Sequence, residues 1–161
     1  MTDLATIAPA FVTMAHRIVW CTVATVDPTG RPRTRILHPI WEWDGNALTG
    51  WIATSPNSPK AADLRATPEV SITYWAPNHH TCTADCSAEF EPGSAERAAG
   101  WDRFAKGPAP VGYDPSIVPG WDAPTSPAFA VLELRPWRLR VFPGSVLLGQ
   151  GGDVLAWSRH A

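Results

Sequence analysis

Three arginines alternate along one short stretch of this chain, at Arg31, Arg33 and Arg35. Residues two apart in a β-strand project to the same face, so a strand here would place all three guanidinium groups together. Like charges on one face repel one another unless they are solvated or share an anion. Two interpretations follow: a clamp for a phosphate, which suits the planar fork of arginine, or an exposed sheet edge that uses charge to resist aggregation.

A second candidate anion site lies in residues 58–68, which read Ser-Pro-Lys-Ala-Ala-Asp-Leu-Arg-Ala-Thr-Pro. Ser58 suits a helix N-cap, Pro59 suits the first helical position, and Pro68 ends the helix. A helix N-terminus offers unpaired N–H groups and a partial positive charge, which attract anions. That charge disfavours a cation in the first turn, so Lys60 there indicates either a bound phosphate or a solvated lysine on a short helix.

Residues for acid–base catalysis are not evident. The sequence contains no Gly-x-Ser-x-Gly element and nothing that links its Ser, His and Asp residues into a triad, so the catalytic residue is unknown. His38 can hydrogen-bond a bound molecule, or it can simply lie between a strand and Pro39. Four tryptophans form either a stacking wall for a ring system or part of the core and a subunit contact: Trp41, Trp43, Trp51 and Trp75.

The segment 106–127 is rich in Pro and Gly, which predicts an irregular loop. It also carries apolar residues, among them Tyr113 and Trp121, and is too apolar for a solvated linker. We expect these two residues either to cover a ligand pocket or the partner subunit beside it, or to cover the outer wall of the fold.

A metal site is a weaker interpretation, although His80, Cys82 and Cys86 share one strand face. A flat strand holds residues 82 and 86 roughly 13 Å apart, too far for one ion. We therefore predict no metal, and buried structural cysteines instead.

Composition narrows the class of protein. The chain has 161 residues, of which 17% are charged, and a formal net charge of −2. This balance predicts no nucleic-acid partner and no anionic membrane partner. No apolar run approaches the roughly 20 residues of a membrane span, and the first residues lack the pattern of a signal peptide. With only 3 cysteines, the sequence predicts a cytoplasmic protein without a disulfide framework.

The 12 glycines and 17 prolines favour short strands over long helices. We expect helices at 4–17, from Ser58, and at 94–104 with Ser94 as its cap. We expect strands at 18–26, 31–43, 47–53, 70–75, 81–90 and 129–142, the last bulged at Pro136, and a terminal hairpin of 146–148 with 154–157. Hairpins in series with inserted helices predict a mainly β fold with a few helices, a small antiparallel barrel that forms one domain over residues 1–161.

Two motifs carry a resemblance to a known family. They are Ala-Thr-Val-Asp-Pro-x-Gly-Arg-Pro-Arg at 24–33 and Lys-Ala-x-x-Leu-x-x-x-Pro-x-Val-Ser at 60–71. In this order the chain resembles the pyridoxamine 5'-phosphate oxidase-like, FMN-binding split-barrel superfamily over roughly its first 90 residues. The resemblance implies an antiparallel split β-barrel and a homodimer with two flavin sites at its interface.

The resemblance also implies site residues. Arg35 together with Arg33, and Ser58 with Lys60, would hold the flavin phosphate. The strand at Thr49, Gly50 and Trp51 would run along the isoalloxazine ring. His38 stands where true pyridoxamine phosphate oxidases have a lysine, and it would contact a flavin edge or a substrate.

The chain departs from those oxidases in a second way, because it ends Trp-Ser-Arg-His-Ala and lacks their Arg-Leu-x-Pro tail. We therefore expect an FMN-dependent oxidoreductase that acts on an unidentified small organic substrate, and not a true pyridoxamine phosphate oxidase. The alternatives are a deazaflavin-dependent reductase and a non-catalytic flavin- or haem-binding protein. Since no Gly-x-Gly-x-x-Gly fingerprint is present, NAD(P)H would serve only as a transient reductant.

Overall fold

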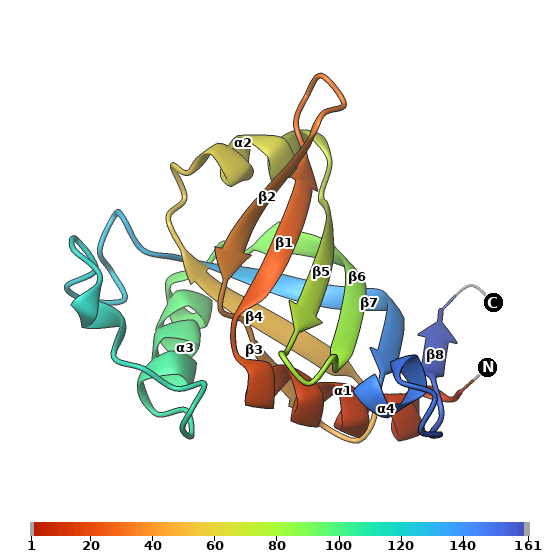
Figure 1. Ribbon diagram of the computed structural model, residues 1–161. Helices are drawn as coiled ribbons and strands as arrows, with labels where there is room; N and C mark the ends of the chain where they lie inside the picture. The colour runs from red at the N-terminus through yellow and green to blue at the C-terminus, as the bar shows by residue number, and fades with distance from the viewer. Residues whose placement is uncertain (1, 160–161) are drawn as a thin grey trace.

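The structure is a computed structural model that describes residues 2–159. It opens with helix α1 (Leu4–Ile18), whose N-terminus is capped by Asp3 through a 2.7 Å hydrogen bond from the Thr6 amide. The apolar residues of α1 recur at helical spacing, and Ile7 and Phe11 are fully buried. The helix lies across one end of the sheet, opposite the end that carries α2 (Figure 1).

Eight strands of the described chain form one antiparallel sheet. They are β1 (Cys21–Val26), β2 (Pro32–Leu37), β3 (Ile40–Trp43), β4 (Leu48–Thr54), β5 (Glu69–Trp75), β6 (Thr81–Phe90), β7 (Ala130–Phe142) and β8 (Leu155–Ser158). The order is β2-β1-β5-β6-β7-β4-β3, and β8 pairs with the second half of β7. Because the edge strands β2 and β3 do not pair with each other, the sheet curls without closing.

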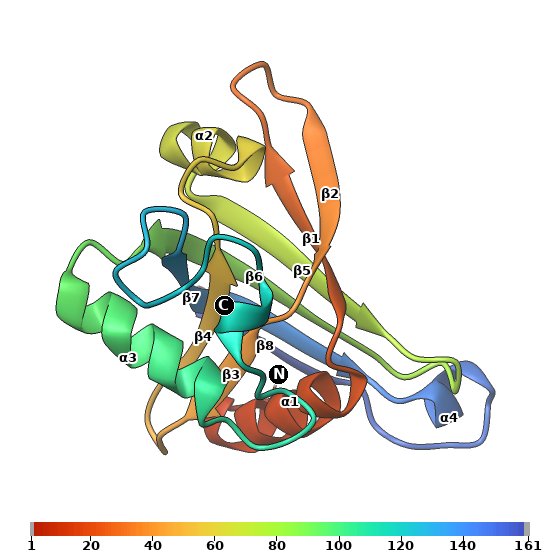
Figure 2. The ribbon, with the colours of Figure 1, turned by 90° about the vertical axis from the view of Figure 1, so that its left-hand side faces the viewer.

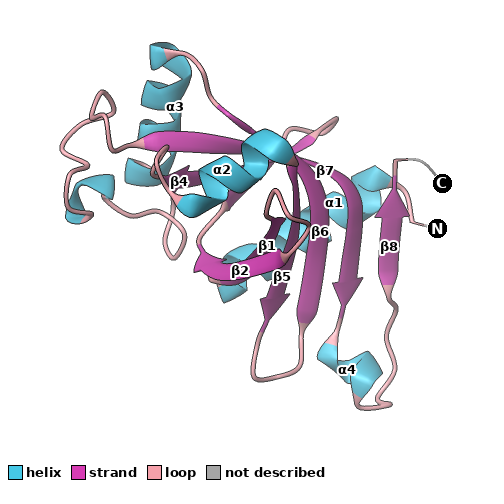
Figure 3. Cartoon of the chain, turned by 90° about the horizontal axis from the view of Figure 1, so that it is seen from above, coloured by secondary structure: helices cyan, strands magenta, loops and turns pink. Residues whose placement is uncertain are grey.

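The remaining helices of the described chain are short. They are α2 (Pro59–Ala66), α3 (Ser94–Ala105), the 3-10 turn η1 (Pro115–Ile117) and α4 (Gly144–Leu147). Helix α2 lies at the same end of the sheet as the β1–β2 hairpin (Figures 1 and 3). Helix α3 and the irregular segment after it lie together at one side, which faces the viewer in Figure 2.

The core fills the inside of the curled sheet. On β6 the predicted alternation is confirmed, since Cys82, Ala84, Cys86 and Ala88 are buried, and only the last member of that face, Phe90, is half-buried. The Trp41 indole is 1% exposed and donates to the Tyr74 hydroxyl at 2.8 Å. This bond satisfies two buried polar groups at the centre of the core.

Three expected elements differ from the structure. The expected strand 31–43 is two strands, because Pro39 lacks an N–H and separates β2, which pairs with β1, from β3, which pairs with β4. The expected terminal hairpin is wrong, because α4 covers part of it and β8 pairs with β7 instead. Gly93, and not Ser94, is the N-cap of α3.

The irregularity expected at Pro136 is confirmed. Cys86 lies opposite Pro136, whereas its neighbour Asp85 lies opposite Arg138, so the strand carries one extra residue here. The strand β7 continues past this bulge, so that its first half pairs with β4 and its second half pairs with β8.

Candidate functional site

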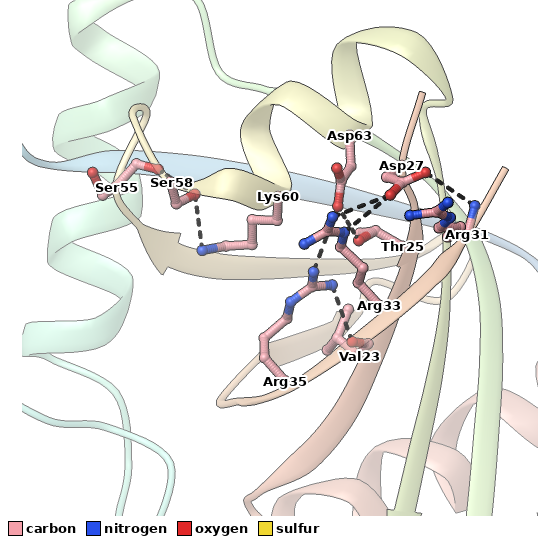
Figure 4. Close-up of polar contacts among 10 residues, drawn as sticks. All are labelled: Val23, Thr25, Asp27, Arg31, Arg33, Arg35, Ser55, Ser58, Lys60 and Asp63. Carbon is pink, nitrogen blue, oxygen red and sulfur yellow. Dashed lines mark hydrogen bonds and ion pairs between the residues drawn. The ribbon is translucent and has the colours of Figure 1, made fainter. Parts of the chain in front are cut away.

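The predicted phosphate residues of β2 and α2 line one surface cavity. We call it the cationic groove; its volume is about 510 Å³ and it is lined by Arg33, Thr34, Arg35, Ser58, Pro59 and Lys60. The short connection between β4 and α2, residues 55–58, brings the helix N-terminus alongside β2, as Figure 4 shows. The fold thus unites the two cationic sites that the sequence presents about 25 residues apart.

Lys60 is the cation of the groove that no acidic side chain of residues 2–159 pairs with. Its ammonium donates to the Ser58 hydroxyl at 3.1 Å, and that hydroxyl donates to the Ser55 carbonyl at 2.9 Å (Figure 4). Ser58 occupies the expected N-cap position, but its side chain makes no capping hydrogen bond. Burial, and then the nearby Arg35 charge, lower the pKa of Lys60, so an anion in the groove would relieve this charge.

Arg35 is held in place from two sides. One terminal nitrogen donates to the Val23 carbonyl at 3.2 Å, and the other lies 3.7 Å from the Asp63 carboxylate. Asp63 is 4% exposed and also accepts a 2.7 Å hydrogen bond from the Thr25 hydroxyl. Burial lowers the pKa of Arg35, and Asp63 partly opposes that effect. The pair of Arg35 and Asp63 is neutral, which leaves Lys60 as the net positive charge beside it.

Arg33 and Arg31 do not converge on the same point as Arg35. The Arg33 guanidinium donates through two nitrogens, at 3.2 and 3.1 Å, to one oxygen of Asp27. The other oxygen of Asp27 accepts from Thr29 and from the Arg31 backbone, and these bonds, Thr29 first, hold the pKa of Asp27 well below its usual range. The three alternating arginines therefore have different roles. The Arg31 amide donates to Asp27 in the turn, whereas Arg33 and Arg35 line the groove, paired with Asp27 and Asp63 respectively.

A second cavity begins where β2 leaves the groove. We call it the aromatic cavity; it has a volume of about 380 Å³, and its lining includes Val19, Trp20, Ile36, His38, Tyr113 and Ile117. The His38 ring lies between two aromatic rings, with its centroid 5.1 Å from that of Trp20 and 5.2 Å from that of Tyr113. Burial lowers the pKa of His38, so the imidazole is neutral at pH 7.

The two residues singled out in the loop 106–127 lie in different places. Tyr113 lines the aromatic cavity, and whether a ligand binds there stays a prediction. Trp121 instead packs against Phe129 at 5.2 Å and donates to the Ala128 carbonyl at 2.9 Å, on the wall of the fold. Only Tyr113 therefore belongs to the candidate site.

Thr49, Gly50 and Trp51 lie on β4 away from these two cavities, neither of which they line. A Cβ on Gly50 would come within 2.7 Å of the Trp41 ring, so this residue faces the core. The Arg103 guanidinium stacks over the Trp51 ring at 3.5 Å. Contact of Thr49, Gly50 and Trp51 with a flavin ring stays a prediction. Ala53, further along β4, borders the aromatic cavity.

The tryptophans considered as a stacking wall are dispersed. Trp41 is buried in the core, Trp43 packs against its margin, and Trp75 is 59% exposed on β5. Trp20 reaches the aromatic cavity, and sequence reasoning missed it. Its only signal is a large apolar residue at the junction of a helix and a strand.

The three cysteines are free and buried. Burial raises the pKa of Cys21 to about 12 and raises those of Cys82 and Cys86 as well, so these thiols are not nucleophiles at neutral pH. His80 accepts a 3.0 Å hydrogen bond from the Gly144 amide. Within residues 2–159, no group of three or more His, Cys, Asp or Glu side chains is placed to hold a metal ion.

A larger cavity of about 610 Å³ lies between β1, β5 and β6 and is also lined by Trp137. Its carboxylates are already engaged: Glu69 accepts from the Trp137 indole at 2.9 Å, and Asp85 accepts from the Ser71 hydroxyl at 2.7 Å. Two acidic side chains make this cavity a poor site for a phosphate.

None of the helices in residues 2–159 is both long and apolar enough to cross a membrane.

Comparisons with known proteins identify the family and the fold. The model of the family described as pyridoxamine 5'-phosphate oxidase matches residues 7–141. A search of the curated proteins found no match.

Solved structures share the fold at low sequence identity. A protein from Clostridium acetobutylicum related to general stress protein 26, of the pyridoxinephosphate oxidase family, is 11% identical with a TM-score of 0.70, over 98% of this chain and 96% of that one. A pyridoxamine 5'-phosphate oxidase-related, FMN-binding protein from Nostoc punctiforme is 20% identical with a TM-score of 0.67, over 97% and 91%. A haem-binding protein from Mycobacterium smegmatis is 21% identical with a TM-score of 0.61, over 99% of this chain and 60% of that one. The expected mainly β, split-barrel architecture is thereby confirmed.

Proposed function

Since this chain belongs to the pyridoxamine 5'-phosphate oxidase family, we propose that it is an FMN-dependent oxidoreductase acting on a small organic substrate. The observation that carries this proposal is the cationic groove, where the half-buried ammonium of Lys60 lies beside Arg35 and has no acidic partner among residues 2–159. A phosphate monoester supplies the missing negative charge. One neighbour of the same fold is named as FMN-binding, which supports FMN as the source of that phosphate.

The donors of the groove fit a phosphate. Lys60 contributes a compact charge, and Arg35 contributes the donors of a guanidinium that Asp63 already orients. The Ser58 hydroxyl accepts from Lys60 and donates to the Ser55 carbonyl. Hydrogen bonds from charged donors are stronger than neutral ones, typically by about twofold. Arg33 lines the same groove, and Asp27 already balances its charge at 3.1 Å. Thr49, Gly50, Trp51 and His38 remain our candidates for contact with the ring end of the cofactor.

When bound, FMN supplies hydride transfer, so the protein needs to provide position, hydrogen bonds and exclusion of water. Arg35 and Lys60 fix the phosphate end. The aromatic cavity, which follows the groove along β2, gives an apolar environment beyond that end. A neutral His38 is the ionisable side chain available there to accept a hydrogen bond.

Further features of the molecule enter the same proposal. We propose one flavin-binding domain over residues 1–161 and a two-fold homodimer with the cofactor between subunits. Exposed apolar side chains support an interface, since Trp20 and Ile36 are each 60% exposed and Trp75 is 59% exposed. The free, buried cysteines fit a cytoplasmic protein, and NAD(P)H would act as a transient reductant.

The visible spectrum of the purified protein, followed by anaerobic addition of NADH or NADPH, tests the proposal. We expect the two visible bands of oxidised flavin, and their bleaching on reduction. A single band of a deazaflavin, or a haem Soret band, would instead support the alternatives of a deazaflavin-dependent reductase or a haem-binding protein. A flavin that binds but is reduced by neither nucleotide would contradict this route of reduction.

A further inference from the structure

A further cavity lies on the face of the sheet opposite the core, at the end far from α2 (Figure 1). We call it the β5–β7 slot; its volume is about 310 Å³, and it is lined by Trp75, His79, Thr81, Thr83, Arg140, Phe142 and Leu147. These residues come from β5, β6, β7, the turn between β5 and β6, and α4, and none comes from β1 or β2. The slot is therefore separate from the cationic groove and from the aromatic cavity.

Strand register places two aromatic side chains on either side of a small one. Thr81 of β6 lies opposite Trp75 of β5 and also opposite Phe142 of β7, so the three residues form one row across the sheet. Two strand spacings separate Trp75 from Phe142, which is roughly 10 Å. Since carbon atoms in contact lie about 3.5–4 Å apart, this gap accommodates one further ring between two aromatic walls.

A close contact between the β5–β6 turn and α4 holds the two ends of the slot (Figures 1 and 2). A Cβ on Gly144 would come within 2.0 Å of the Asn78 carbonyl oxygen, so this approach requires glycine. The Gly144 amide also donates to Nδ1 of His80 at 3.0 Å. His79, at the end of the turn, has a φ of 64°, which is uncommon for a residue other than glycine. The fold thereby fixes His79 and Leu147 beside the slot before any molecule enters.

Arg140 gives the slot a positive charge that no ion pair within residues 2–159 balances. Its guanidinium carbon lies 5.0 Å from the centroid of the Phe142 ring, and the described chain offers it no hydrogen-bond acceptor. The neighbouring cation on the same face of β7, Arg138, is paired with Asp85 at 3.4 Å. No lining residue of the slot is Asp or Glu. A carboxylate in the slot would supply the counter-charge, since a guanidinium binds it through two parallel hydrogen bonds.

Trp75 lies between the slot and the apolar surface that supports the proposed subunit contact. Its strand, β5, pairs with β1 on one side and with β6 on the other. Trp20 and Ile36 lie toward β1 and β2, whereas the slot lies toward β6 and β7. An apolar side chain of a second subunit would fill the slot but leave Arg140 without a counter-charge. An aromatic anion matches both the rings and the charge, so a small molecule is the better occupant.

We propose that the β5–β7 slot is a second ligand site, and that its ligand is a planar aromatic carboxylate whose ring stacks between Trp75 and Phe142 and whose carboxylate pairs with Arg140. The hydroxyls of Thr81 and Thr83 remain to orient further polar substituents. A volume of about 310 Å³ is near the lower end for ligand pockets and fits one or two fused rings. The site does not rest on the flavin function proposed above, since it shares no residue with the cationic groove.

Calorimetric titration of the purified protein with three matched probes tests this proposal. 2-Naphthoate is planar and anionic, 2-naphthamide is planar and neutral, and decahydro-2-naphthoate is anionic but not planar. We expect 2-naphthoate to bind about tenfold more tightly than the amide, the lower range for a charge-assisted hydrogen bond, because Arg140 is exposed. We expect it to bind about fivefold more tightly than the decahydro acid, because only a flat ring stacks on both walls.

Four variants assign the binding to the slot. Arg140→Gln should remove the preference for 2-naphthoate over 2-naphthamide. Arg138→Gln is the matched control and should keep that preference, because Arg138 lies on the same face and is already paired. Thr81→Phe fills the gap between the two rings and should prevent binding of all three probes. Lys60→Ala changes the groove only and should leave the probe affinities unchanged, and equal urea midpoints show that the variants are folded.

A preference for 2-naphthoate that survives Arg140→Gln, or that Lys60→Ala removes, would overturn the proposal. Equal affinities for the three probes would also overturn it, as would the absence of binding in the wild type, which is the result expected if a second subunit covers the slot. FMN affinity, measured separately by flavin fluorescence, keeps the two proposals distinguishable. A protein that selects 2-naphthoate through Arg140 but does not bind FMN would support the slot and refute the flavin function.

Discussion

In the cationic groove, the buried Asp63 carboxylate accepts from Thr25 at 2.7 Å and faces the Arg35 guanidinium at 3.7 Å. At the aromatic cavity, His38 directly follows β2, three residues after Arg35, and its Nε2 is a buried atom that has no hydrogen-bond partner within residues 2–159. Both are polar atoms out of contact with water, but only the first is satisfied within the protein. The satisfied pair stabilises the fold beside the groove, whereas a buried acceptor without a partner destabilises it.

Of the substitutions considered for these two regions, the one at Asp63 should change the free energy of unfolding most. Asp63→Ala removes a buried carboxylate and leaves Arg35 without its counter-charge, so we expect a loss of about 3 kcal/mol in the free energy of unfolding. Urea denaturation of the cofactor-free protein measures it. Asp102→Ala is the matched control, because Asp102 forms an exposed ion pair with Lys106 and should cost at most about 1 kcal/mol. Equal losses in the two variants would contradict the structural role of Asp63.

The same measurement on His38→Phe sharpens the contrast. Removing an unpartnered acceptor also removes its desolvation penalty, which offsets the lost bond to Val111. We therefore expect the free energy of unfolding to change by less than about 1 kcal/mol. A loss as large as that of Asp63→Ala would show that His38 is a structural residue and would remove the contrast.

Another histidine, His16, should give a smaller effect on the free energy of unfolding, and this effect depends on pH. Nε2 of His16 accepts from the Trp41 amide at 2.9 Å, so this imidazole is neutral, like that of His38, but its Nε2 has a hydrogen-bond partner. Burial lowers its pKa below the ordinary 6.5, so the unfolded chain binds the proton more readily, and stability should fall as the pH drops below about 6.5. The slope is at most about 1.4 kcal/mol per pH unit for one proton.

His16→Gln keeps an acceptor but does not titrate, so its stability should fall less between pH 7.5 and 5.5 than that of the wild type. Glu91, whose pKa is raised to about 7, chiefly by burial and then by Glu133, stabilises the fold as the pH falls. Glu91 and His38 are present in both proteins, so the difference between the two urea midpoints isolates His16. Parallel pH profiles would contradict the assignment.

The cationic groove was predictable from local patterns. Alternation placed Arg33 and Arg35 on one strand face, and Ser58, Pro59 and Lys60 read as a helix N-terminus. What local pattern could not predict is the pairing of charges. Asp27 meets Arg33 through the register of the β1–β2 hairpin, and Asp63 meets Arg35 because the fold brings α2 beside β2.

The aromatic cavity was only partly predictable. Tyr113 was expected near a ligand because a Pro-rich loop with apolar residues must pack somewhere, but Trp20 depends on the dihedral angles of Val19, which no periodicity encodes. The interruption after β2 did have a signal in Pro39, and the long run of β-favouring residues obscured it. The placement of Thr49 to Trp51 depends on pairing register with β3 and β7, a tertiary property.

The phosphate grip is the central claim, and FMN titration by flavin fluorescence tests it most directly. Arg35→Ala and Lys60→Ala should each weaken binding by about 1.5–3 kcal/mol, the range for charge-assisted hydrogen bonds. Arg33→Ala should cost less, because Asp27 already holds that guanidinium, and the exposed Lys106→Ala should leave the affinity unchanged. Wild-type affinity in both Arg35→Ala and Lys60→Ala would contradict the account.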